Sequence, residues 1–275
     1  MEKLATTTLK SQENSHFVMN SLLQTDGTAA ISDVGSGRPI LLLHGGGGTG
    51  TVFGLSQALA AKARVLLPTH PGFDGTPRPA HLDSVPELAR FYIKLLETLD
   101  LDNVLLIGSS IGGWVAAEMV LIGSNRIGGL ILLNSVGIEV PGEPLVDVSG
   151  LPRPELIRLA SHNPDLIMAN TPPMTPERLA NLASNAVALA TYDHGAAMMA
   201  PGLRERLAAV SAPALVLWGE SDGIASPAYG QAYATAFSNG RFELITEAGH
   251  LPQIEQPVRV LAHIESFIRE LDSAA

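Results

Sequence analysis

The 275-residue sequence predicts an α/β fold with a mostly parallel central sheet, flanking helices and an inserted helical segment. Short aliphatic runs of strand length alternate with longer amphipathic stretches, a pattern typical of parallel sheets covered by helices. This alternation stops between about residues 140 and 207, where prolines are frequent and no strand-like run occurs. Hydrophobic residues make up 46% of the chain, which is enough to bury a large core.

The predicted elements follow one another in a regular order. Residues 16–20 and 28–33 are expected to form an antiparallel N-terminal pair that closes through Gly35-Ser36-Gly37. A helix is expected to begin at Ser84-Val85-Pro86-Glu87, which has the pattern of a capping box with proline near the first turn. The aliphatic runs predicted to form the central strands are 40–43, 64–67, 104–107, 130–133, 214–218 and 242–245.

The break in the alternation predicts two structural units. Residues 1–139 and 208–275 are assigned to the α/β core, and residues 140–207 to a helical insertion. Within the insertion, Thr175 is expected to cap a helix that has Pro176 at its first position and continues to Ala190.

Ser110 is the predicted nucleophile of a catalytic site. It lies at the centre of the pentapeptide Gly108-Ser109-Ser110-Ile111-Gly112, directly after a buried strand and before a helix. A G-x-S-x-G sequence in this context forms a tight turn that holds the serine strained, with its hydroxyl exposed. The pentapeptide alone also occurs by chance, so the context carries the prediction. Ser109 is a chemical alternative, but it precedes the turn and should point away.

A base and an orienting acid follow Ser110 in the order expected of a serine hydrolase. Asp222 lies in the loop after the strand at 214–218, and His250 follows the strand at 242–245. We therefore predict a triad of Ser110, Asp222 and His250. Glu220 in the same loop is the main alternative acid, and Asp74 is a more distant one.

The glycine run after the strand at 40–43 predicts an oxyanion-binding loop. Without side chains, His44-Gly45-Gly46-Gly47-Gly48 can curl and present backbone N–H groups. Gly46 is the first candidate donor and Gly47 the second, together with the N–H of Ile111 at the start of the next helix. The alternatives are a merely flexible loop and a phosphate-binding loop. The latter needs Lys-Ser/Thr after the glycines or a GxGxxG motif, and the sequence has neither.

Together these motifs resemble those of the α/β-hydrolase superfamily, and the resemblance covers nearly the whole chain. The resemblance implies that residues 140–207 form a cap over the carboxyl ends of the strands and set substrate size. Relatives usually carry aspartate before a Pro-Gly pair, whereas this chain has His70 at that position. His70 is either an additional titrating group at the rim of the site or a neutral, hydrogen-bonded residue. The matching motifs are His44-Gly45-Gly46-Gly47, Gly108 to Gly112, Gly219-Glu220-Ser221-Asp222 and Ala248-Gly249-His250.

Four residues are predicted to contact the substrate: Trp114, Met198, Met199 and Leu251. Each has a structural alternative. Trp114 is at least as well suited to packing a helix on the sheet, and methionines often fill gaps between a cap and a core.

The predicted activity is hydrolysis of a small, largely apolar carboxylic ester or lactone through an acyl-enzyme. Members of the resembled family that cleave C–C bonds of meta-cleavage products keep the serine triad and are an alternative. They usually have tryptophan after the histidine and proline in the oxyanion loop, where this chain has Leu251 and Thr49. A small-molecule binding protein without turnover is a further alternative. Epoxide hydrolases and dehalogenases of the family use aspartate at the position of Ser110 and are disfavoured.

Composition excludes several other function classes. The formal net charge of −10 makes nucleic acid an unfavourable partner, and the lack of cysteine excludes disulfides and thiol catalysis. The histidine spacing fits no metal motif, so neither a metal nor another cofactor is expected. Residues 1–15 lack the apolar region of a signal peptide, and no apolar run is long enough to span a membrane. A cytoplasmic protein is therefore expected. A homodimer is the candidate oligomeric state.

Overall fold

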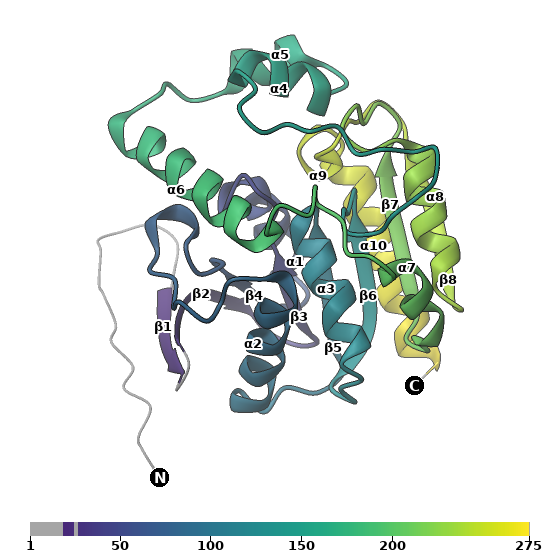
Figure 1. Cartoon of the computed structure of the whole chain (residues 1–275). Helices are drawn as coiled ribbons and strands as arrows, with labels where there is room; N and C mark the ends of the chain where they lie inside the picture. Colours follow the sequence, from purple (N-terminus) through teal and green to yellow (C-terminus); the bar gives the residue numbers. More distant parts are fainter. Residues whose placement is uncertain (1–18, 25–26, 275) are drawn as a thin grey trace.

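The computed structural model describes residues 19–24 and 27–274, which form a sheet with helices on both faces (Figure 1). The sheet has eight strands in the order β1-β2-β4-β3-β5-β6-β7-β8. β2 pairs antiparallel with β1 and β4, whereas the neighbours from β4 to β8 are parallel. The strands are β1 (Met19–Gln24), β2 (Gly27–Gly35), β3 (Pro39–Leu43), β4 (Arg64–Pro68), β5 (Val104–Ser109), β6 (Ile127–Leu133), β7 (Ala214–Gly219) and β8 (Gly240–Ile245).

The six predicted central strands are confirmed as β3 to β8, but the N-terminal prediction needs correction. The first strand was expected at residues 16–20 and begins at Met19; residues 16–18 lie outside the described residues. Gln24 pairs with Gly27, so the hairpin closes there and Gly35-Ser36-Gly37 leads from β2 to β3 instead. Glycines occur at both ends of β2, so the turn-forming residues alone did not decide which end closes the hairpin.

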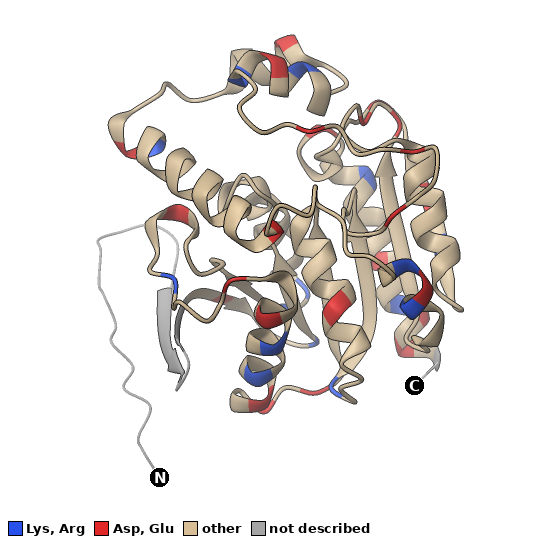
Figure 2. Cartoon of the chain, in the orientation of Figure 1, with Lys and Arg blue, Asp and Glu red and all other residues tan. Residues whose placement is uncertain are grey.

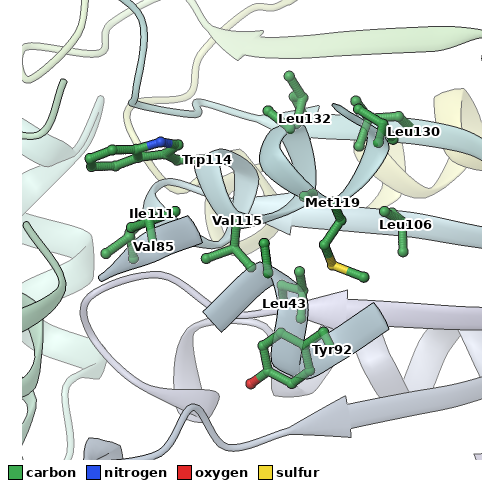
Figure 3. Packing of buried hydrophobic residues seen from close by; sticks show 14 of the residues in the cluster. Leu43, Val85, Tyr92, Leu106, Ile111, Trp114, Val115, Met119, Leu130 and Leu132 are labelled. Carbon is green, nitrogen blue, oxygen red and sulfur yellow. The ribbon is translucent and has the colours of Figure 1, made fainter. Parts of the chain in front are cut away.

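Side chains of the central strands alternate between two buried clusters. In β3, Ile40 and Leu42 belong to the cluster completed by α1 and α10, whereas Leu41 and Leu43 belong to the one completed by α2, α3 and α8. Because helices cover both faces, the inner strands β3, β5, β6 and β7 contain no charged residue, whereas the edge strand β8 contains Arg241 and Glu243. Figure 3 shows the second cluster around α3. These helices are α1 (Phe53–Leu59), α2 (Val85–Thr98), α3 (Ile111–Leu121), α8 (Pro227–Ala236) and α10 (Pro257–Ala274).

The predicted start of α2 is correct in position but wrong in its hydrogen bonding. The helix begins at Val85 with Ser84 as the preceding cap residue and proline in the first turn. The Ser84 side chain, however, makes no capping hydrogen bond, so the predicted capping box does not form. The helix is held mainly by its apolar face, including Leu88 and Leu95, both buried in the core.

The segment between β6 and β7 is helical and, throughout this fully described stretch, adds no strand to the sheet. α6 begins where the sequence predicts, with the Thr175 hydroxyl accepting from the Arg178 N–H at 3.2 Å, and extends beyond Ala190. The helices are α4 (Arg153–Ala160), α5 (Pro164–Asn170), α6 (Pro176–Asp193) and α7 (Leu203–Arg206). That residues 140–207 act as a cap stays a prediction.

Charges of both signs are spread over the outer helices and loops (Figure 2). α6 has charged residues only near its ends, at Glu177, Arg178 and Asp193, and none from Leu179 to Tyr192. Among the helices of residues 19–24 and 27–274, none is long and apolar enough to cross a membrane.

Candidate active site

Ser110 occupies a strained turn between β5 and α3. Its φ of 54° and ψ of −120° lie outside the regions that non-glycine residues ordinarily adopt. The close approach of strand and helix explains the flanking glycines. A Cβ atom at Gly108 would lie 2.4 Å from the Gly112 carbonyl oxygen, and one at Gly112 would lie 2.4 Å from the Leu43 carbonyl oxygen. The turn therefore packs against the helix on one side and against β3 on the other.

A continuous chain of hydrogen bonds joins Ser110, His250 and Asp222. The Ser110 hydroxyl lies 3.0 Å from Nε2 of His250, and Nδ1 of His250 lies 2.8 Å from an Asp222 carboxylate oxygen. The three residues follow β5, β8 and β7, whose carboxyl ends meet at one edge of the sheet. His250 and Asp222 are 7% and 6% exposed, so the acid and base are shielded from bulk water.

The Asp222 carboxylate accepts hydrogen bonds at both oxygens. One oxygen accepts from the N–H groups of Ile224 and Ala225 at 2.8 and 3.2 Å. The other accepts from His250 and from the Asn134 side-chain amide, which lies at 2.7 Å. Burial opposes ionisation of Asp222, but the charge and hydrogen bond of His250 and the remaining donors outweigh it and hold the pKa of Asp222 below its ordinary value. Asp222 is therefore an ionised acceptor for the imidazole.

Asn134 is a site residue that the sequence analysis missed. It follows β6 directly, is fully buried and has a positive φ of 43°, a conformation that asparagine tolerates better than most residues. Its amide oxygen accepts from the Gly219 N–H at 3.1 Å while its NH₂ donates to Asp222. A polar residue at the carboxyl end of a buried strand, at the edge where the triad residues meet, was the available signal.

The alternative acids and nucleophile do not contact the histidine. Glu220 is exposed and accepts from the Glu247 N–H at 3.2 Å, whereas Asp74 is hydrogen-bonded to Thr49 and Asn185. Ser109 is fully buried, and its hydroxyl lies 3.4 Å from the Gln253 amide. None of these residues is placed to orient or be activated by His250.

The glycine run contacts Ser110 as an oxyanion loop would. A Cβ atom at Gly45 would lie 3.2 Å from the Ser110 Cβ, so the loop runs directly beside the nucleophile. Within the described part of the chain, the N–H groups of Gly46 and Ile111 donate to no other residue. Gly46 is half-buried beneath Leu189 of α6, whereas Gly47 is exposed. Gly46 and Ile111 are therefore better placed than Gly47, and the role of all three stays a prediction.

His70 is a buried, hydrogen-bonded residue below the glycine run. Its N–H donates to Nε2 of His44 at 3.0 Å, and its Nε2 lies 3.0 Å from the His44 carbonyl oxygen. The carbonyl can only accept, so His70 carries its proton on Nε2 and accepts at Nδ1 from the Tyr92 hydroxyl at 2.6 Å. His44 then carries its proton on Nδ1 and donates to the Gly45 carbonyl at 2.7 Å. Of the two interpretations of His70, the neutral structural one fits this geometry.

Both histidines resist protonation. Burial lowers the pKa of His44 to about 4, and burial together with the neighbouring His44 lowers the pKa of His70 well below its ordinary value of 6.5. The unfolded chain binds protons at these positions below pH of about 6.5. We therefore expect the free energy of unfolding to fall as the pH drops from about 6.5 toward 4, with no contribution from these histidines above that range.

Urea unfolding at a series of pH values measures this effect. His70→Gln should make the stability curve less steep below pH 6.5, by up to about 1.4 kcal/mol per pH unit, because glutamine does not titrate. The exposed His81 supplies the control, and His81→Gln should leave the slope of the parent protein unchanged. Equal slopes for His70→Gln and the parent would contradict the buried neutral histidine.

The predicted substrate-contacting residues lie in two places. Trp114 is 3% exposed and packs under Gly137, which forms a β-bridge with Met199. Met198 and Met199 are half-buried in the loop between α6 and α7. Leu251 is also half-buried and immediately precedes the short helix α9 (Pro252–Glu255). Substrate contact by any of the four residues stays a prediction.

The end of α4 is hydrogen-bonded to both loops that carry the acid and the base. The Leu159 carbonyl accepts from the Gly223 N–H at 3.0 Å, and the Ala160 carbonyl accepts from the His250 N–H at 2.8 Å. Glu255 adds a side-chain link that sequence reasoning missed. Its carboxylate accepts from the Gly249 N–H at 2.7 Å and from the His162 and Asn163 N–H groups at 3.1 and 3.0 Å.

Comparisons with known proteins agree with this architecture. A sequence profile of the alpha/beta hydrolase family matches residues 40–263. The chain is 24% identical to a 2-hydroxymuconate semialdehyde hydrolase of Pseudomonas sp. strain CF600, over 97% of this chain and 99% of that protein. It is 28% identical to a 2-hydroxy-6-oxononadienedioate/2-hydroxy-6-oxononatrienedioate hydrolase of Dechloromonas aromatica, over 90% of this chain and 93% of that protein. A thermophilic esterase from Thermogutta terrifontis superposes with a TM-score of 0.67 and 27% identity, over 94% of this chain and 99% of that one.

Proposed function

The chain belongs to the alpha/beta hydrolase family, and we propose that it hydrolyses a small, largely apolar carboxylic ester or lactone through an acyl-enzyme. The observation that carries this proposal is the hydrogen-bonded chain from the strained Ser110 through His250 to the ionised Asp222. A serine is a weak nucleophile by itself, and an adjacent base held by an acid is the arrangement that activates it.

The proposed reaction uses each group at a stated atom. Ser110 Oγ attacks the acyl carbon while Nε2 of His250 takes its proton, and Asp222 stabilises the imidazolium that forms. The tetrahedral oxyanion accepts from the N–H groups of Ile111 and Gly46. The imidazolium then gives its proton to the departing alkoxide, which leaves Ser110 acylated. Water, deprotonated by His250, attacks this ester, and the imidazolium returns the proton to Ser110 Oγ as the carboxylic acid departs.

A neutral ester or lactone suits the surroundings of Ser110 better than an anionic substrate. Among the described residues no lysine or arginine is buried, so no shielded cation supports a carboxylate next to the triad. The part of α6 that covers Gly46 presents Leu189, and this helix is uncharged from Leu179 to Tyr192. An apolar acyl group gains from such contacts, whereas a carboxylate loses its hydration without a partner.

Cleavage of a C–C bond is the second candidate. It is favoured by similarity to two curated hydrolases named for a semialdehyde and for dienedioate or trienedioate substrates. The same triad serves both reactions, so the difference lies in substrate recognition. A binding protein without turnover is a weaker candidate, because every element that activates Ser110 is present.

Labelling with a fluorophosphonate tests the activated serine. We expect one equivalent of label per chain in the parent protein and none in Ser110→Ala, because only an activated serine reacts readily with such reagents. A second step screens p-nitrophenyl esters, lactones and dienone acids for turnover. Absence of label in a folded protein would contradict serine catalysis, and turnover confined to dienone acids would replace the ester proposal with C–C hydrolysis.

A further inference from the structure

Asp74 lies between the glycine run and the helix α6. It belongs to the single-turn helix η2 (Phe73–Gly75) and has a φ of 49°, a left-handed conformation that is uncommon outside glycine, although aspartate and asparagine adopt it more readily than other residues. Strain of this kind persists where surrounding contacts fix the residue. Asp74 contacts two segments to which different functions are proposed, namely the oxyanion loop and the cap.

On one side Asp74 binds the glycine loop, defined as residues 44–49. One carboxylate oxygen accepts from the Thr49 N–H at 3.0 Å and from the Thr49 hydroxyl at 2.8 Å. The other oxygen lies against Gly48, where a Cβ atom would be only 2.3 Å away. A proline at position 49 would provide neither the N–H nor the hydroxyl, so Thr49 is suited to this partner.

On the other side Asp74 binds the cap helix. The Asn185 amide of α6 donates to the carboxylate at 3.1 Å, and the Asp74 N–H donates to the Asn185 amide oxygen at 2.6 Å. Asn185 is 3% exposed, so water competes little for these two bonds. The Tyr192 hydroxyl adds a second link between α6 and this loop by donating to the Pro71 carbonyl at 2.9 Å.

The glycine loop needs anchors because it contains four consecutive glycines. Glycine loses more conformational freedom on ordering than any other residue, so such a loop does not hold an N–H group in place unaided. At its first end His44 holds the Gly45 carbonyl, which belongs to the same peptide unit as the Gly46 N–H. At its second end Thr49 is held by Asp74.

We propose that Asp74 is a positioning residue which couples the cap helix α6 to the oxyanion donor Gly46. Asn185 fixes Asp74, Asp74 fixes Thr49, and the glycine loop between Thr49 and His44 then presents the Gly46 N–H toward Ser110. Leu189, on the same helix as Asn185, covers Gly46 directly. The inference rests on the proposed serine hydrolysis and adds that the position of the cap controls stabilisation of the transition state.

The Asp74 and Asn185 side chains permit a reciprocal exchange. In Asp74→Asn the new NH₂ group must face either an N–H donor of Thr49 or the NH₂ of Asn185, and in Asn185→Asp two carboxylates face each other. In the double variant Asp74→Asn/Asn185→Asp, the new amide oxygen at 74 accepts from Thr49, its NH₂ donates to the carboxylate at 185, and that carboxylate accepts from the N–H of residue 74. Every bond of the parent arrangement is restored.

Steady-state kinetics on p-nitrophenyl acetate, chosen because its acyl group is small, measures the effect. Each single variant should lose at least about tenfold in kcat with little change in KM, since loss of an oxyanion donor costs on the order of 10²- to 10³-fold. The double variant should recover to within about threefold of the parent. Ser184→Ala is the matched control, because it removes the 3.1 Å bond from the Gly75 N–H to α6 without affecting Thr49. Its kcat should equal that of the parent.

The rate of amide hydrogen exchange at Thr49 measures how firmly Asp74 holds the Thr49 N–H, and it can be determined without any catalytic activity. Exchange should be faster in both single variants and slow again in the double variant. Unchanged exchange and kcat in the folded single variants would overturn the proposal, as would a folded double variant without recovery or an equal loss of kcat in Ser184→Ala. If the parent protein hydrolyses no ester and is not labelled by fluorophosphonate, the proposed function is wrong. The hydrogen-exchange measurement still decides whether Asp74 holds the glycine loop.

Discussion

Replacing Asp222 by asparagine should lower kcat by about 10⁴-fold, the loss found when the acid of a Ser-His-Asp triad becomes an amide. The two N–H groups of Ile224 and Ala225 bind one carboxylate oxygen, so the amide oxygen of the variant is expected at that position. Its NH₂ group then faces Nδ1 of His250, which must become an acceptor. The proton of His250 moves to Nε2, and the imidazole cannot take the proton of Ser110.

Glu220→Gln is the matched control for this prediction, because Glu220 is the other carboxylate of the same loop. Its side chain accepts from the Glu247 N–H on the surface, and its replacement should change kcat by less than about twofold. Circular dichroism should show that both variants are folded. The opposite ranking of the two variants in steady-state kinetics would rule out Asp222 as the acid.

Replacing Gly108 by alanine should destabilise the fold by about 3 kcal/mol or more and abolish activity. The added Cβ would lie 2.4 Å from the Gly112 carbonyl oxygen and 2.6 Å from the Gly113 Cα. Both are backbone atoms of α3, so no side-chain rotation relieves the overlap. The helix must move away from β5, which displaces the N–H of Ile111 and the hydroxyl of Ser110 together.

Gly54→Ala is the corresponding control, since a Cβ at Gly54 in α1 would meet no atom within 4 Å. This variant should be as stable as the parent or slightly more so, because alanine favours helix by about 1 kcal/mol over glycine. Urea unfolding measures both variants. Equal stability of Gly108→Ala and Gly54→Ala would contradict the close packing of the turn around Ser110 against α3.

The sequence was most informative where chemistry and local structure coincide. The pentapeptide around Ser110 predicts a strand, a turn and a helix from adjacent residues, and the structure has each of them. His250 and Asp222 could be selected because each follows an aliphatic run long enough to be a central strand. Parallel strands end at one edge, so strand order alone places these side chains near one another.

The contacts that the sequence did not reveal are those made across long chain separations. Asn134 and Asp222 are 88 residues apart, and Asp74 and Asn185 are 111 residues apart. Neither asparagine belongs to a motif, and nothing in the sequence sets one polar residue against a particular distant partner. His70 shows the same limit, because its two interpretations differ only in burial, which depends on how the chain packs around it.

The backbone hydrogen bonds from the end of α4 to the loops of Asp222 and His250 have a consequence for which residues can be substituted there. Leu159 and Ala160 contribute their carbonyl groups, and Gly223 and His250 contribute their N–H groups. Main-chain groups are the same in every residue except proline, so the side chains at 159 and 160 can drift without loss of these bonds. A change of length in the loop between β6 and α4 can be absorbed there, since loops tolerate insertions and deletions. What has to be kept is the position at which α4 ends, because its last carbonyl groups meet both loops.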